Sequence, residues 1–169
     1  MNTESGKTRD ISSYRVFTYD QIRVFFKHTD YHGYVHPYNY LEWMSYTREA
    51  YFQDLVPNFL ELCQRNIKMV TADVEFTLLA DAVFGDGVVI RIHSENVRRL
   101  SFDVVFEFFR QQDDACLGKG RQRLTFLDAE TGRPARIPEE LKAVVLLYEK
   151  KHGAEESSLG SDKRVLDGK

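Results

Sequence analysis

Residues 25–43 read FFKHTDYHGYVHPYNYLEW, and this stretch decides the fold because a strand pattern at its start gives way to a helical pattern at its end. A turn lies between the two patterns and carries one carboxylate, Asp30, and one glycine, Gly33. A turn of this kind directs side chains towards the start of a helix, where the first backbone N–H groups have no partner within the helix. We therefore expect a functional group in this turn.

The segment before the turn predicts a strand. Residues 14–27 are rich in β-formers, and Ile22, Val24 and Phe26 alternate with the residues between them, which indicates one buried face. After the turn, apolar residues from 38 to 55 follow a helical spacing and cover more than half of the circumference. This pattern predicts a helix that other elements surround, and residues 58–65 favour a short second helix.

The hydrophobic period then changes from 3.6 to 2, which predicts four consecutive strands at residues 67–79, 88–97, 100–110 and 116–128. In the first of them, Val70, Ala72, Val74 and Phe76 should share one side. Short turns join the last three strands, so they should pair antiparallel. A final helix is expected from Pro138 to about residue 151. The order predicts an α+β fold in which one antiparallel five-stranded sheet wraps around one long central helix.

The composition is that of an ordinary globular domain. The chain has 169 residues, of which 43% are hydrophobic and 29% charged, with a net charge of −3. This balance favours neither nucleic acid nor an anionic membrane as a partner. No apolar run approaches the roughly 18 residues that span a bilayer, and the polar start is unlike a signal peptide. Cys63 and Cys116 lack metal-site spacing, so we expect reduced thiols and a cytoplasmic location. A single domain should span 14–152, between a disordered arm (1–13) and a disordered tail (153–169).

The turn also resembles a known signature. Asp30, Gly33, Val35 and Tyr40 match the second aspartate, the glycine, the valine and the tyrosine of the pattern found in hotdog-fold acyl-CoA thioesterases of the 4-hydroxybenzoyl-CoA thioesterase type. Asn39 and Trp43 also match, whereas His28 stands where the pattern has its first aspartate. The similarity continues to about Ala143. It implies the hotdog fold, with residues 38–55 as the central helix, and a homodimer or homotetramer in which each site forms at a dimer interface.

The resemblance implies that Asp30 cleaves the thioester, either as the nucleophile or as the general base that activates water. The alternative is that Asp30 only caps the turn. In the family a backbone N–H seven residues after the aspartate polarises the carbonyl, but this position is Pro37, which has no N–H. Two alternatives stay open: a neighbouring amide such as that of Tyr38 replaces this donor, or the substrate binds in a different position. No cofactor or metal is expected.

Two further groups of residues are implied to bind the substrate. Basic residues after the second of the four strands hold the phosphates of coenzyme A in the family, and here these are Arg98 and Arg99. The acyl end is expected to contact Gly33, Val35, His36, Tyr38, Asn39 and Tyr40.

Several alternatives stay open. His28, His32 and His36 are spaced four apart, which on a helix would suit a metal, but Gly33 interrupts the pattern; we expect His36 near the substrate, and His28 and His32 facing solvent. Glu42 is the reserve carboxylate, because another hotdog branch uses a helical glutamate. The acyl carrier could be a carrier protein rather than coenzyme A. The chain could also be a non-catalytic acyl-binding hotdog protein.

Overall fold

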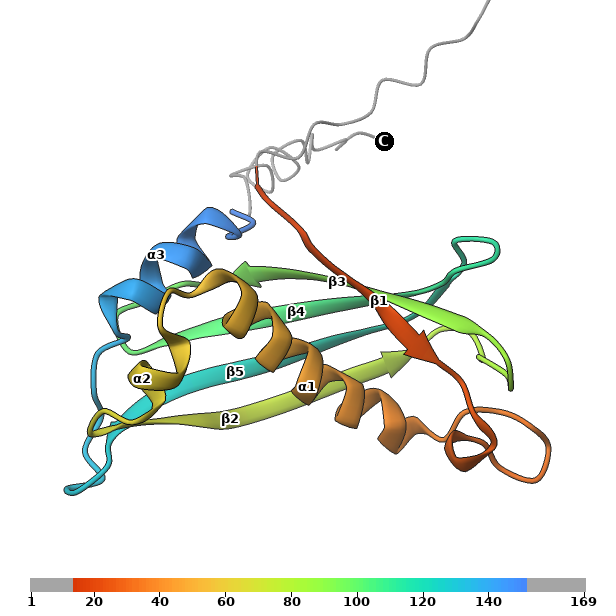
Figure 1. The fold of residues 1–169 in the computed structure, drawn as a ribbon, viewed down its shortest axis with the longest axis horizontal. Coiled ribbons are helices and arrows are strands. Elements are labelled where there is room, and N and C mark those ends of the chain that lie inside the picture. Colours follow the sequence, from red (N-terminus) through yellow and green to blue (C-terminus); the bar gives the residue numbers. More distant parts are fainter. Residues whose placement is uncertain (1–13, 152–169) are drawn as a thin grey trace, which may run out of the picture.

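The structure is a computed structural model that describes residues 14–151. Figure 1 shows one curved sheet with a long helix across one of its faces. The elements in chain order are β1 (Phe17–Arg23), the short 3-10 helix η1 (Phe26–His28), α1 (Pro37–Leu55), α2 (Phe59–Cys63), β2 (Ile67–Leu78), β3 (Gly87–Glu95), β4 (Ser101–Arg110), β5 (Cys116–Asp128) and α3 (Glu139–Leu147). The expected arm and tail lie outside the described residues.

The sheet has five strands in the order β1-β3-β4-β5-β2, and every neighbouring pair is antiparallel. The predicted α+β class, the five strands, the long helix and the short second helix are all confirmed. Strands β1 and β2 form the two edges of the sheet. One long edge of β2 therefore has no neighbouring strand among the described residues.

The core lies between α1 and the face of the sheet that α1 covers. Two glycines of β5 make room for the helix: a Cβ on Gly118 would lie 2.6 Å from Phe76 Cζ, and one on Gly120 would lie 2.6 Å from Met44 Sδ. Side chains at these points would force α1 and β2 away from the sheet centre. The largest fully buried side chains are Trp43, Tyr40, Tyr51, Phe52, Phe102, Phe106, Phe108, Phe126, Met44, Ile90, Ile92 and Leu117.

Two details of the predicted side-chain pattern are wrong. The register of β2 shifts between Thr71 and Asp73, so Val70 pairs on the outer side of the sheet whereas Phe76 packs towards the helix. A bulge inserts one residue and reverses the alternation, which hydrophobicity alone does not reveal. The second detail is Phe26, which is exposed because β1 ends at Arg23 and η1 follows.

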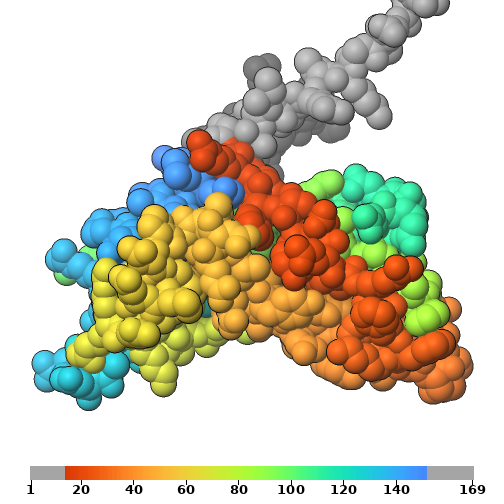
Figure 2. Space-filling view, in the orientation of Figure 1, coloured from red at the N-terminus to blue at the C-terminus, as the bar shows by residue number. Residues whose placement is uncertain are grey.

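Figure 2 shows that β1, α1 and α2 together form much of this face of the molecule. Helix α3 follows beside them at the end of the molecule where α2 lies. Within residues 14–151, none of the helices has the length and hydrophobicity that crossing a membrane requires.

Candidate active site

The turn between β1 and α1 is closed by its own backbone. The Asp30 amide donates to the Tyr34 carbonyl (2.8 Å), and the Gly33 amide donates to the Asp30 carbonyl (3.0 Å). Gly33 has a φ of 85°, a left-handed conformation that favours glycine. The motif glycine is therefore needed for the shape of the turn that presents Asp30.

The two oxygens of the Asp30 carboxylate differ in their hydrogen bonds to residues 14–151. Oδ1 accepts hydrogen bonds from the amides of His32 (2.9 Å) and Tyr34 (3.1 Å). Oδ2 accepts no hydrogen bond from residues 14–151. Asp30 thus caps the turn, as the simpler interpretation expected, and still presents a second oxygen for chemistry.

The environment of Asp30 favours the ionised form. Desolvation alone would raise the pKa of this carboxyl, but the amide hydrogen bonds from Tyr34 and His32 lower it, and so do the nearby charges of His32 and His36. The pKa of Asp30 consequently lies below its usual value. A carboxylate of this kind is available as a base or nucleophile at neutral pH.

The start of α1 is fixed to the turn by a buried amide. Asn39 Nδ2 donates to the carbonyl of His28 (2.8 Å) and to that of His36 (3.2 Å), and the His36 amide also donates to the His28 carbonyl (3.0 Å). Pro37 occupies the first position of the helix, so it offers no N–H there. The amide of Tyr38 belongs to the first turn, whose N–H groups have no partner within the helix.

A second segment holds the turn from its other side. Val35 donates its amide to the Ala82 carbonyl (3.0 Å), and Tyr34 forms a β-bridge with Val83. Asp86 stabilises this segment by accepting hydrogen bonds from the Val83 amide (3.0 Å) and from Arg110 Nε (3.1 Å). Sequence analysis missed Asp86 and Arg110, because the glycines beside Asp86 indicated only a turn and nothing in the sequence links it to β4.

The expected substrate-binding residues divide into two sets. Gly33, His36 and Tyr38 lie on the accessible side of the turn and helix start, and the His36 and Tyr38 rings stack with centroids 5.3 Å apart. Val35, Asn39 and Tyr40 are buried, and Tyr40 stacks on Phe76 at 4.8 Å. The buried set supports the shape of the site from beneath.

His28 does not face solvent, so that expectation is wrong. It is 8% exposed, its Nδ1 accepts a hydrogen bond from the Phe25 amide (3.0 Å), and its ring packs edge-on against Trp43 at 5.4 Å. Burial lowers the pKa of His28, and the charge of Lys27 lowers it further. The short helix η1 turns this ring inwards. The hydrophobic pattern of the sequence did not predict this helix. His32 is exposed, as expected.

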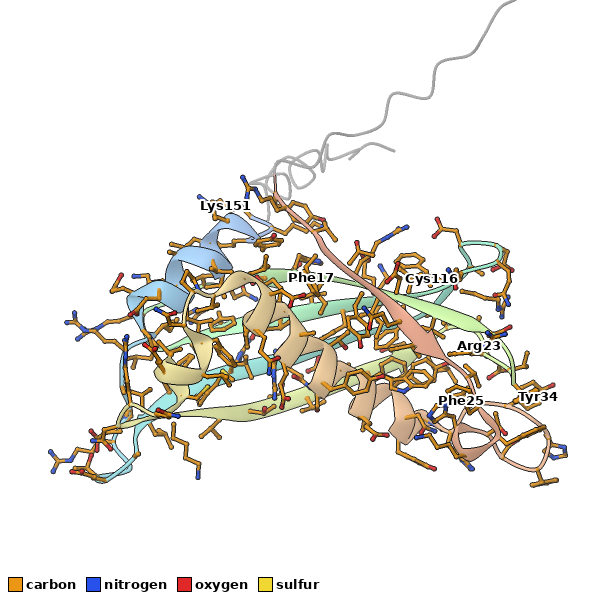
Figure 3. All side chains as sticks on the ribbon, viewed as in Figure 1. Phe17, Arg23, Phe25, Tyr34, Cys116 and Lys151 are labelled. Atoms are coloured by element: carbon orange, nitrogen blue, oxygen red, sulfur yellow. The ribbon has the colours of Figure 1, made fainter. Side chains whose placement is uncertain are left out.

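Exposed apolar side chains gather at this end of the molecule. Figure 3 shows Phe25 and Tyr34 beyond the end of β1, whose last residue is Arg23. A large exposed apolar surface commonly marks a contact site. We call the set the turn-end apolar surface: it consists of Phe25, Phe26, Tyr31, Tyr34, Tyr38, Leu41, Leu78, Leu79, Val83 and Phe84.

Arg98 and Arg99 lie far from Asp30 within the chain. They form the β3–β4 turn, at the end of the sheet where α2 and α3 lie (Figure 1), and the Arg99 carbonyl accepts a hydrogen bond from the Ile137 amide before α3 (3.2 Å). One chain therefore does not bring the expected catalytic and coenzyme-binding residues together. Glu42 is exposed on α1. No cluster of three metal-ligating side chains occurs in residues 14–151.

A curved antiparallel sheet around one long helix is the hotdog fold, which hotdog thioesterases share. The chain belongs to the thioesterase-like superfamily, whose family model matches residues 24–145. A search of curated protein sequences finds no significant match.

Solved structures share the fold at low sequence identity. A 1,4-dihydroxy-2-naphthoyl-CoA thioesterase from Synechocystis is 14% identical with a TM-score of 0.71, and the match covers 78% of this chain and 96% of that one. The dynemicin thioesterase, studied for polyene binding, is 24% identical with a TM-score of 0.72 (79% and 96%). A Staphylococcus aureus protein in complex with CoA is 15% identical with a TM-score of 0.74 (90% and 97%).

Proposed function

We propose that this protein is an acyl-CoA thioesterase in which Asp30 initiates hydrolysis. The observation that carries the proposal is the difference between the two oxygens of one carboxylate before α1: two amides hold Oδ1, and Oδ2 accepts no hydrogen bond from residues 14–151. A side chain fixed in this way keeps its reactive oxygen in place without further ordering.

Two routes fit this geometry. As a general base, Asp30 Oδ2 takes a proton from water, the resulting hydroxide attacks the carbonyl carbon, and the C–S bond breaks to release a thiolate that is then protonated. As a nucleophile, Oδ2 attacks the same carbon and displaces the thiolate, and water then hydrolyses the mixed anhydride. Both routes place negative charge on the carbonyl oxygen.

The donor for that oxygen is proposed to be the Tyr38 amide. Pro37 removes the N–H at the usual family position, and the next amide along belongs to the same open first turn. The helix dipole adds positive potential at this end of α1. The rings of His36 and Tyr38 flank the helix start and are proposed to border the acyl thioester.

A second copy of the chain is proposed to complete the site. The free edge of β2 invites pairing with another β2, and a two-fold axis makes such a pair antiparallel. Each β2 end then meets the opposite end of its neighbour. This arrangement brings Arg98 and Arg99 of one copy to the end where Asp30 of the other lies, so they can hold the phosphates of its coenzyme A.

The cysteines support a cytoplasmic site of action, which we also propose. Both are free thiols, Cys63 exposed and Cys116 half-buried. Neither has a disulfide partner in residues 14–151, a pattern typical of reducing compartments.

The test is thiol release from a panel of short, long and aromatic acyl-CoAs by the wild type, Asp30→Asn and the matched control Asp54→Asn, whose carboxylate is exposed on α1. Turnover should fall by roughly two orders of magnitude or more in Asp30→Asn, the scale of a lost acid–base group. Asp54→Asn should match the wild type. Unchanged turnover in Asp30→Asn would transfer the role to Glu42, and wild-type inactivity on every CoA ester would favour a carrier-protein substrate or a binding protein.

A further inference from the structure

The β2–β3 connection, residues 79–86, is hydrogen-bonded to the turn before α1. The Val35 amide donates to the Ala82 carbonyl (3.0 Å), and the Phe84 amide donates to the Gly33 carbonyl (3.3 Å). The turn that presents the carboxylate is therefore tied to a second backbone segment as well as to its own amides. A displacement of this connection should displace the turn with it.

Asp86 is the last residue of the connection, and its buried carboxylate fixes the connection to the sheet. Oδ2 accepts hydrogen bonds from the Val83 amide (3.0 Å) and Arg110 Nε (3.1 Å), and Oδ1 accepts one from Gln112 Nε2 (3.2 Å). Arg110 Nη2 also donates to the Asp81 carbonyl (2.7 Å). A carboxylate only accepts hydrogen bonds, so Asp86 satisfies three donors that converge on it.

The ion pair between Asp86 and Arg110 joins the connection to the middle of the sheet. Arg110 is the last residue of β4, the strand that lies third of five in the sheet. The two side chains are only 10% and 24% exposed, so removal of either partner leaves the other charge poorly compensated. Contacts thus run from β4 through this pair and the connection to the turn.

We propose that Asp86 and Arg110 are positioning residues for the hydrolysis: through the β2–β3 connection they hold the turn so that the Asp30 carboxylate keeps its place before α1. They act on the reaction through the turn rather than through the substrate. A displacement of about 1 Å at a catalytic group can lower the rate roughly a hundredfold. The inference rests on the proposed function and adds two residues that lie outside the turn and α1.

Asp86→Ala tests the proposal against the matched control Asp103→Ala. Asp103 lies near the other end of β4, is 1% exposed and accepts hydrogen bonds from Arg123 and Asn96. Each variant removes a buried carboxylate from an arginine and an amide, but only Asp86 is linked to the turn. Thiol release from an acyl-CoA should show kcat roughly tenfold lower in Asp86→Ala with KM little changed, and nearly wild-type kcat in Asp103→Ala. Equal losses of kcat would overturn the proposal.

A double variant tests whether the two residues act as one unit. Arg110→Ala should lower kcat in the same way as Asp86→Ala. The variant with both substitutions should be little slower than Asp86→Ala alone, because the second change removes a contact that is already lost. Losses of kcat that multiply would overturn the pairing.

The pH dependence of kcat/KM gives a readout that a loss of stability alone does not change. Against desolvation, the amides of Tyr34 and His32 and the charges of two nearby histidines lower the pKa of Asp30. A displaced turn weakens these amide hydrogen bonds and so raises that pKa. The acid limb should therefore move to higher pH in Asp86→Ala and stay in place in Asp103→Ala. The same acid limb in both variants would contradict the positioning role.

Amide hydrogen exchange separates this inference from the proposed function, because it needs no substrate. Relative to the amides of α1, those of Val35 and Phe84 should exchange roughly tenfold faster in Asp86→Ala and at the wild-type ratio in Asp103→Ala. This result with a fully active Asp30→Asn would reject the proposed role of Asp30 and leave the link from Asp86 to the turn supported. A wild-type ratio in Asp86→Ala would overturn the link, whatever the activity of Asp30→Asn.

Discussion

The two ends of the sheet are built in different ways. At one end, a local turn of a few residues holds the Asp30 carboxylate through its own amides, and Asn39 joins this turn to the start of α1. At the other end, two distant parts of the chain enclose an apolar cavity: α2 with the start of β2, and the end of β5 with α3. The turn that presents Asp30 depends on short-range hydrogen bonds, whereas the apolar cavity depends on tertiary packing. Substitutions at the two ends should consequently change different measurements.

The largest effect is expected where the sheet supports the Asp30 end. Gly118→Val would place side-chain atoms 2.6 Å from Phe76 Cζ and 2.8 Å from the Thr77 carbonyl oxygen, which is backbone and cannot move aside easily. We expect a loss of about 3 kcal/mol in the free energy of unfolding. Denaturant titration measures it. Lys119→Val, one residue along and exposed, should lose well under half as much, and equal losses would contradict the packing explanation.

The next effect concerns the amide that joins the turn to α1. Asn39→Ala leaves the carbonyls of His28 and His36 without the side-chain donor, so stability should fall by about 2 kcal/mol. Because the helix start shifts relative to Asp30, kcat should also fall roughly tenfold. Denaturation and steady-state kinetics give both values.

Asn66→Ala is the control for this change at the opposite end. Asn66 donates to Asp128 Oδ2 at 3.0 Å on the surface, so its removal should change stability by less than about 0.5 kcal/mol and leave kcat unaltered. A comparable loss of kcat in both variants would mean that the turn is not specially held by Asn39.

A smaller effect is expected from the basic β3–β4 turn. Replacing Arg98 and Arg99 together by alanine should raise KM for acyl-CoA by roughly five- to tenfold, the scale of exposed charge-assisted contacts with phosphate, and leave kcat unchanged. Thioesters of N-acetylcysteamine, which lack the phosphates, should show no change. Arg15→Ala serves as the control for a lost exposed cation. An equal rise in KM for both substrate types would contradict coenzyme binding by this turn.

The sequence was sufficient to predict the elements with strong periodicity and to place Asp30 and Gly33 in a turn. Alternation and helical spacing predicted the five strands and α1 because each pattern reflects one buried face. The bulge in β2 and the short helix η1 were missed, because each shifts the chain by a residue or two without a hydrophobic signal. These two shifts explain the wrong expectations for Val70 and for His28.

Contacts between elements distant in the sequence could not be predicted from the sequence either. The contact of Asp86 with Arg110 joins residues 24 positions apart, and the cavity joins α2 to α3, which lie still further apart in the sequence. Such contacts depend on how the sheet curves, which local sequence does not encode. The resemblance supplied Arg98 and Arg99, but only the fold shows that they stand at the opposite end from Asp30 in the same chain.

The smallest expected effect is a shift in the pH dependence of activity. It tests whether the ionised Asp30 carboxylate initiates hydrolysis, as proposed. Desolvation raises the pKa of Asp30, but hydrogen bonds from the Tyr34 and His32 amides, together with the charges of His32 and His36, lower it by more, so the folded pKa lies below the ordinary value of about 3.9. In the proposed mechanism the carboxylate is the active form. Activity should therefore be complete above that ordinary value and decline only as pH falls through the lowered pKa of Asp30.

The stability of the fold should change with pH in the same direction as the activity. A depressed pKa in the folded state means that the carboxylate stabilises the turn above its unfolded pKa and that this contribution disappears as pH falls through the folded pKa. The measurement is kcat/KM between pH 3 and 8, roughly the range in which carboxylates and histidines titrate, with unfolding followed over the same range. Asp54→Asn should retain the acid limb, whereas the residual activity of Asp30→Asn should lack it. An acid limb that persists unchanged in Asp30→Asn would contradict Asp30 as the group that titrates.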